Sequence, residues 1–214
     1  MKYLCLFAFC CLLSCATKTK PLDPCFMEAG IKTAKSFDKD NPLGEKTEKY
    51  MLVEYDEQGK PLKVVNTIQK MKSDYIYEDG KLKYVIATNS MSDVDEIKAE
   101  VRVDTLFITK NDDKGRKLEG VGGNGVKYEF SYVGCEQEAT IIYDETGVKR
   151  NMMQLFKENG NIKKRVTTFY YPGESSVTSK YIDYKFDSKG HWIERSLERQ
   201  NGTIETELRV IEYY

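Results

Sequence analysis

Residues 181–195 read Tyr-Ile-Asp-Tyr-Lys-Phe-Asp-Ser-Lys-Gly-His-Trp-Ile-Glu-Arg. Side chains alternate through the first six positions: Ile182, Tyr184 and Phe186 face one way, and Tyr181, Asp183 and Lys185 face the other. A period of two residues is typical of a β-strand. Asp187 can hydrogen-bond its own backbone two residues on, and Gly190 accepts the positive φ of a tight turn. The stretch therefore predicts a β-hairpin.

The same turn recurs along the chain. An acid, two variable residues and a glycine follow an aromatic residue or Asn within residues 55–59, 111–115, 143–147 and 186–190. A shorter Asp-Gly or Asn-Gly turn lies within residues 78–80, 158–160 and 200–202. The intervals predict about 12 strands of roughly 7–10 residues. The connections are too short for crossover helices, so we expect an all-β, antiparallel meander built from repeated hairpins.

The Tyr-Asp-x-x-Gly turn followed by a strand resembles the YD repeat of RHS proteins. It also resembles a hairpin near the carboxyl terminus of small Bacteroidetes lipoproteins, although His191 stands where those proteins usually carry Asn. The resemblance covers about residues 48–214. RHS repeats build large hollow shells, which these few turns cannot enclose. The resemblance therefore implies a curved, open meander sheet.

The amino terminus predicts a targeting signal. Lys2 precedes an apolar run from Tyr3 to Leu13, which is about half the length of a membrane-spanning helix and predicts a secretory signal. Leu12-Leu13-Ser14-Cys15 resembles the lipobox, which implies a signal peptide over residues 1–14 and lipidation of Cys15. Acyl chains on Cys15 would anchor the protein to a membrane.

Two further segments precede the repeats. Residues 15–24 predict a lipidated tether, because Pro and alternating Thr and Lys cannot bury a face. Residues 25–47 predict an irregular or short-helix cover segment before the β-repeat domain at 48–214. Ala16 is unlike the inner-membrane retention Asp, and residues 17–20 are basic rather than acidic. We therefore expect a lipid-anchored protein of the outer membrane, on its periplasmic face in preference to the cell surface.

Charge and cysteine content narrow the class further. Loss of Lys2 with the signal leaves slightly more acidic than basic residues, among 33 Lys and Arg and 34 Asp and Glu in the full chain. Nucleic-acid binders are clearly basic, so we expect no nucleic-acid partner. Cys25 and Cys135 are the cysteines that remain beside Cys15, and an oxidising envelope predicts a disulfide between them.

No cluster of catalytic or metal-binding residues is visible in the sequence. His191 is the sole histidine and follows a turn glycine, which favours a turn or surface role over a triad or a zinc site. Asp93 and Asp95 lack the rest of a calcium loop. The glycine-rich residues 120–125 precede a predicted strand and so indicate a hairpin connection. We expect no cofactor and no metal.

Aromatic residues are the most suggestive binding feature. A single sheet cannot bury rings on both faces, so some rings could stack on sugars or contact a partner protein. The candidates are Tyr170, Tyr171, Trp192, Tyr213 and Tyr214. Charged residues that alternate along the strands indicate a solvated face of the sheet.

Three functions follow from these patterns. The first is a non-enzymatic envelope lipoprotein whose β-repeat surface binds a protein or glycan partner. The second is an immunity or accessory protein for a secreted toxin, which the RHS-like repeats alone suggest. The third is a glycan hydrolase that uses paired carboxylates, which predicts Asp or Glu side chains with raised pKa in a pocket.

Overall fold

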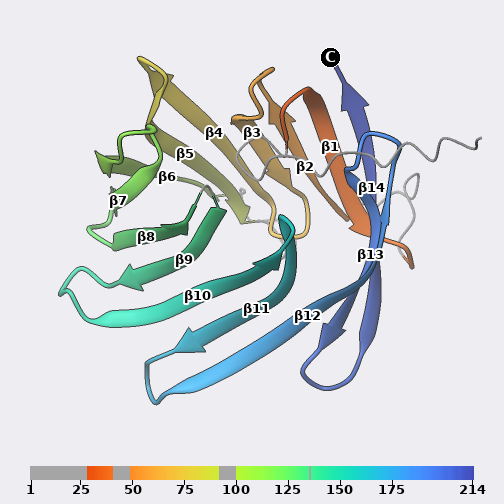
Figure 1. Ribbon diagram of the computed structural model, residues 1–214. Helices are drawn as coiled ribbons and strands as arrows, with labels where there is room; N and C mark the ends of the chain where they lie inside the picture. The colour runs from red at the N-terminus through yellow and green to blue at the C-terminus, as the bar shows by residue number, and fades with distance from the viewer. Residues whose placement is uncertain (1–27, 41–48, 92–99, 135) are drawn as a thin grey trace, which may run out of the picture.

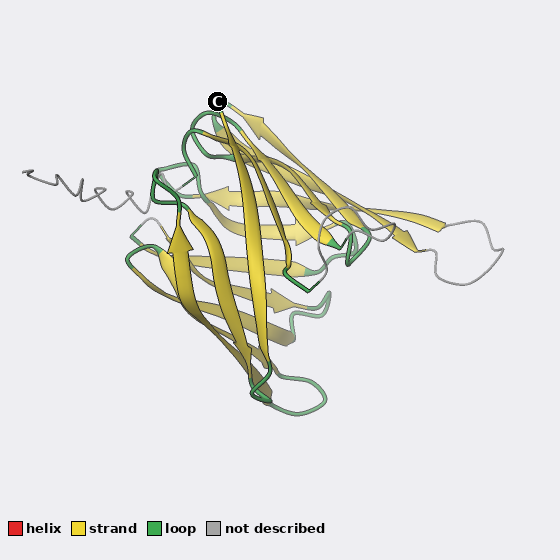
Figure 2. Cartoon of the chain, turned by 90° about the vertical axis from the view of Figure 1, so that its right-hand side faces the viewer, coloured by secondary structure: helices red, strands yellow, loops and turns green. Residues whose placement is uncertain are grey.

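The computed structural model describes residues 28–40, 49–91, 100–134 and 136–214. This part of the chain contains strands and connecting turns but no helix (Figure 2). The strands are β1 (Ile31–Asp38), β2 (Tyr50–Tyr55), β3 (Pro61–Asn66), β4 (Met71–Glu78), β5 (Lys81–Met91), β6 (Glu100–Asn111), β7 (Lys117–Gly122), β8 (Lys127–Val133), β9 (Glu136–Tyr143), β10 (Lys149–Glu158), β11 (Asn161–Phe169), β12 (Ser175–Phe186), β13 (Trp192–Arg199) and β14 (Ile204–Tyr213). The all-β, antiparallel prediction is confirmed.

The expectation of an open sheet is wrong. Each strand pairs with its neighbours in sequence, and β1 also pairs with β14, which closes the sheet into a barrel (Figure 1). The closing register runs from Ile31 opposite Tyr213 to Asp38 opposite Glu207. The small number of turns and the comparison with RHS shells led to the wrong expectation. Closure is favoured because it satisfies the backbone groups of two edge strands that an open sheet would expose.

Part of the predicted cover segment is also different from the prediction. Ile31–Asp38 is a strand, neither helix nor irregular chain. Its inward side chains include Ala34 and Ser36, which are small and buried. With such residues at inward positions, the alternation of hydrophobic and polar residues that predicts a strand is weak in this part of the sequence. The predicted segment's residues 25–27 and 41–47, together with residues 1–24, lie outside the described residues.

The predicted turns are confirmed in atomic detail. In each acid-x-x-Gly turn one carboxylate oxygen accepts two backbone N–H groups, those two and four residues on. The four acids are Asp56, Asp112, Asp144 and Asp187. A backbone N–H of the glycine donates to the carbonyl of the acid in each case, at 2.9–3.1 Å. The acid thus holds both sides of the hairpin and fixes the strand register.

Asp144 has the fullest set of contacts. Its carboxylate accepts the hydroxyl of Thr146 at 2.6 Å, the amide of Val148 at 2.9 Å and Nε of Arg150 at 2.7 Å. The Thr146 hydroxyl, followed by the Val148 amide and the Arg150 guanidinium, lowers the pKa of Asp144 to about 2 against the opposing effect of desolvation.

This lowered pKa predicts a pH-dependent stability difference. We expect Asp144→Asn to unfold at lower urea concentration than the wild type, since the amide nitrogen cannot accept from Arg150. The contribution is fully present above the ordinary aspartate pKa of about 4 and is lost as the pH falls toward 2. Urea midpoints of both proteins from pH 2 to 7 would check this, and a gap that stays constant down to pH 2 would contradict it.

The turn at residues 56–59 also supports the start of β1. Gly59 has a φ of +82°, and a Cβ placed on it would lie 2.7 Å from the backbone nitrogen of Ala29 and 2.7 Å from the carbonyl carbon of Glu28. The amide of Gly30 donates to the carbonyl of Glu57 at 3.1 Å. Residues 28–30 therefore pack directly on this turn, and that contact tolerates only glycine.

Gly147 is a matched control for this contact, because its φ is +85° and nothing lies within 4 Å of its added Cβ. We expect Gly147→Ala to cost roughly 1–2 kcal/mol of unfolding free energy for the left-handed backbone alone. Gly59→Ala should cost clearly more, since the backbone of residues 28–29 must also move. Urea unfolding of the two variants measures the difference; equal losses would show that this packing contributes nothing.

Candidate functional site

The concave face of the sheet encloses a cavity of about 430 Å³. It is lined by residues of β1, β2, β3, β11, β12, β13 and β14, together with the turn after β3. These strands are consecutive in the barrel, so a cavity touched by both extremes lies inside it. The residues are Ser36, Phe37, Asp38, Met51, Asn66, Ile68, Gln69, Arg165, Tyr181, Arg195, Leu197, Arg199, Glu205, Thr206 and Glu207. We call the barrel end with the β3–β4, β11–β12 and β13–β14 turns the mouth end, and the opposite end the packed end.

One wall of the cavity is a ladder of ion pairs between β13 and β14. Arg195 donates Nε to Glu207 at 2.7 Å, and Arg199 donates Nη2 to Glu205 at 2.6 Å. The Arg195 and Glu207 side chains are only 12% and 25% exposed. Burial is the largest single effect and opposes the charge on Arg195, but the Glu207 carboxylate and the Tyr184 hydroxyl together outweigh it and raise the pKa of the guanidinium. Both acids are thus committed to cationic partners.

Aromatic rings and a second guanidinium fill the packed end. Arg195 lies over the rings of Tyr181, at 4.5 Å, and Trp192, at 4.0 Å. Arg209 lies 4.9 Å from the Trp192 ring and donates to Glu28 at 2.7 Å. Burial raises the pKa of Tyr55, the phenol that Arg209 also contacts. This packing makes a floor, so the cavity is reached from the mouth end.

Arg165 stands on β11 and lines the cavity, in the same cross-strand row as Ser179 of β12 and Arg199 of β13. Its cross-strand neighbours are Leu155 and Ser179, neither of which is charged. Within residues 28–40, 49–91, 100–134 and 136–214, the structure gives its guanidinium no hydrogen bond or ion pair. It differs in this respect from Arg195 and Arg199.

The outer face of the barrel is charged as well. Successive residues of a strand point to opposite faces, so the neighbours of inward Ser73, Tyr181 and Leu197 point outward. Outward lysines pair with acids on the same or the next strand at 2.8–3.3 Å. The pairs are Lys63–Glu54, Lys72–Asp74, Lys180–Glu198 and Lys185–Glu194. These side chains are about a quarter to two thirds exposed. These partly exposed ion pairs indicate that the outer face contacts water.

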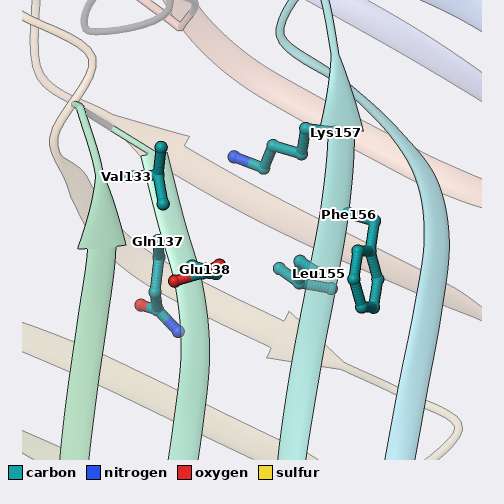
Figure 3. A pocket seen from close by; sticks show the side chains of 6 residues that line it. All are labelled: Val133, Gln137, Glu138, Leu155, Phe156 and Lys157. Atoms are coloured by element: carbon teal, nitrogen blue, oxygen red, sulfur yellow. The ribbon is translucent and has the colours of Figure 1, made fainter.

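A smaller pocket of about 230 Å³ lies between β9 and β10. Figure 3 shows Leu155 and Lys157 reaching from β10 toward Gln137 and Glu138, with Phe156 turned aside. Phe156 and Val133 are 42% and 63% exposed. With few polar groups converging on it, this pocket is a weaker candidate than the cavity at the mouth end.

The five predicted binding aromatics do not form one surface. Tyr170 and Tyr171 lie at the mouth end beside the β11–β12 turn, where Lys149 and Arg150 contact their rings. Trp192, Tyr213 and Tyr214 lie at the packed end. Tyr214 donates its hydroxyl to the carbonyl of Tyr55 at 2.5 Å. Trp192 and Tyr213 therefore serve the packing of this barrel end, whereas Tyr214 is 60% exposed beside them, and the structure does not bring these three rings to the first two.

His191 is buried in the β12–β13 turn. Its Nδ1 lies 2.9 Å from the hydroxyl of Tyr213, which in turn donates to Asp187. Desolvation and the bond to Asp187 raise the pKa of Tyr213. The cluster of His191, Tyr213 and Asp187 connects the last strand, β14, to the β12–β13 turn, which agrees with the predicted turn role of His191. Cys15, Cys25, Cys135, Asp93 and Asp95 lie outside the described residues, so the lipidation and the disulfide stay predictions.

Sequence reasoning missed the cavity residues. Arg195, Leu197 and Arg199 alternate before the Asn201-Gly202 turn, and Glu205 and Glu207 alternate after it. Opposite charges at matching positions of a hairpin form cross-strand pairs on one face. The sequence pattern predicts a solvated face for such charges, but closure of the barrel turns this set inward. Arg165 carried no comparable signal.

Comparisons with known proteins give structural neighbours only. No family model matches the chain, and no curated protein matches it. A solved porin-like protein from Bacteroides uniformis is 14% identical, covers 86% of this chain and 99% of its own, and has a TM-score of 0.44. A porin-like protein from Bacteroides vulgatus is 10% identical, with coverages of 86% and 98% and a TM-score of 0.45. No helix among the described residues is long and apolar enough to cross a membrane.

Proposed function

We propose that this protein is a non-enzymatic envelope lipoprotein whose barrel stands in water and binds a glycan in the cavity at its mouth end. The observation that carries the proposal is the cavity itself, which lies inside the barrel and has a packed floor. Its volume of about 430 Å³ falls in the range of small-molecule sites. Attachment to the membrane rests on the predicted lipidation of Cys15.

The outer face supports an aqueous position for the barrel. A lysine facing lipid at the middle of a membrane costs about 2–4 kcal/mol. Lys63, Lys72 and Lys180 lie within strands on the outward face, each beside an acid. Exposed pairs of this kind contribute little to stability in water. They therefore indicate contact with solvent and do not stabilise the fold appreciably.

The lining supports a ligand rich in hydroxyl groups. Most cavity residues carry amide, carboxylate, hydroxyl or guanidinium groups, and Met51, Ile68 and Leu197 supply apolar contact. The Asn66 side chain donates to Gln69 Oε1 at 3.2 Å and accepts the Gln69 backbone N–H at 3.0 Å, which leaves the Gln69 side-chain amide as a further donor. A ligand without polar groups would desolvate the polar groups of the lining without replacing their hydrogen bonds to water.

The carboxylates support binding rather than hydrolysis. A glycoside hydrolase needs one protonated acid beside a second carboxylate. Glu205 and Glu207 each accept a hydrogen bond from an arginine, at 2.6 and 2.7 Å, so the structure pairs them with cations rather than with each other. Among the described residues, each Asp or Glu with a resolved change has a lowered pKa, as at Asp112, Asp144, Asp187 and Glu194.

The aqueous position can be tested by removing the anchor. The mature chain carrying Cys15→Ala, exported behind an ordinary cleavable secretory signal, should be recovered in the soluble fraction without detergent. The lipidated wild type should sediment with membranes. Immunoblots of both fractions give the answer, and an unacylated chain that stays in the membrane after carbonate washing would show that the barrel itself contacts lipid.

The glycan site can be tested by filling it. We expect the mature protein to bind members of a panel of envelope and dietary oligosaccharides, measured by calorimetry, and to release no product from them. Met51→Trp places a large ring in the cavity and should weaken binding at least about tenfold, or about 1.4 kcal/mol.

Ile204→Trp is the matched control, because Ile204 is 60% exposed and points outward beside Glu205. It should bind as the wild type does. Equal affinity of both variants would place the ligand elsewhere on the barrel, and turnover of any oligosaccharide would overturn the non-enzymatic part of the proposal.

A further inference from the structure

The cavity holds three arginines and three acids, but their pairing is uneven. Glu207 neutralises Arg195, and Glu205 neutralises Arg199, at 2.7 and 2.6 Å. Arg165 is left without a partner among the residues that the structure describes. The third acid, Asp38, stands opposite Glu207 on the neighbouring strand β1. One positive charge therefore remains on the β11 wall, while the β1–β14 wall keeps an excess of negative charge.

An unpaired guanidinium inside a cavity is a strong recognition group. It presents five N–H donors in a planar fork that matches a carboxylate with two parallel hydrogen bonds. Arg165 makes no hydrogen bond or ion pair with the described part of the fold, and its cross-strand neighbours, Leu155 and Ser179, are uncharged. Its guanidinium is thus available to a ligand, whereas those of Arg195 and Arg199 are occupied.

The other charges limit which anion fits. Asp38 lines the cavity without an ion pair among the described residues, and its charge repels a ligand that carries many negative charges. A polyanion gains at Arg165 but loses at Asp38. A ligand with one isolated carboxylate, flanked by neutral hydroxyl groups, satisfies both walls.

We propose that Arg165 is the specificity-determining residue of this cavity and that the ligand is an acidic saccharide whose single carboxylate binds the Arg165 guanidinium. This inference rests on the proposed glycan-binding function. Arg165 holds the carboxylate at the β11 wall, and the polar side chains of β1, β3 and β14 contact the neutral part of the saccharide.

The experiment compares paired probes on the mature protein. Oligosaccharides with one uronic acid are titrated beside their neutral counterparts, in which the carboxylate is replaced by a hydroxymethyl group. The wild type should bind the uronic acid form about tenfold or more tightly, as for a charge-assisted pair. Arg165→Gln should remove this preference, so that the acidic and neutral forms bind with equal affinity, and Arg165→Lys should restore part of it.

Lys164→Gln is the control, because it removes the same charge from the adjacent position of β11. Lys164 points to the outer face, where its ammonium lies 4.1 Å from the centre of the Phe156 ring. It should keep the preference of the wild type. Urea midpoints should show that Arg165→Gln is folded, since no described residue loses a partner.

The outcomes separate the two proposals. Binding of neutral and acidic forms with equal affinity, or an Arg165→Gln variant that keeps the preference, overturns the role of Arg165 and leaves the glycan site standing. No binding of any saccharide by the folded wild type overturns the glycan-binding function and the acidic ligand with it. Tighter binding of probes with several carboxylates contradicts the single-charge requirement.

Discussion

Pairing of the first described strand with the last is the constraint on which the rest of the barrel depends. Ile31–Asp38 contributes backbone hydrogen bonds to β14 on one side and β2 on the other. Without it the meander would expose two long edges, a ready template for association with other chains. Closure also decides which face of a strand is inside, because side chains alternate along a strand except where a bulge shifts the register, as between Ile182 and Lys185.

The consequences of closure are plainest where charges lie. The same alternation puts Lys180 and Glu198 in water and puts Arg195 and Glu207 against the cavity. The barrel therefore carries charge on both faces, and we propose that it stands in water around a polar binding site.

The two ends of the barrel differ in their side chains. At the packed end Trp192, Arg209 and Glu28 stack and pair, and the Asp187, His191 and Tyr213 cluster secures the final strand. At the mouth end the lining is polar and one guanidinium has no described partner. Most of the aromatic residues predicted to bind a ligand lie at the packed end, because aromatic rings fill space and form the core where a barrel end is closed.

The sequence by itself determined the local structure. The period of two around Phe186, the acid of each turn and the glycine after it specify hairpins, because they depend on contacts within a few residues. Closure, the strand at Ile31–Asp38 and the cavity were decided by tertiary structure alone. They depend on contacts between residues more than 150 positions apart, such as Phe37 with Leu208, and no local pattern records them. For the same reason the inward direction of Arg165 could not be predicted: a period of two shows which residues share a face but not which face is enclosed.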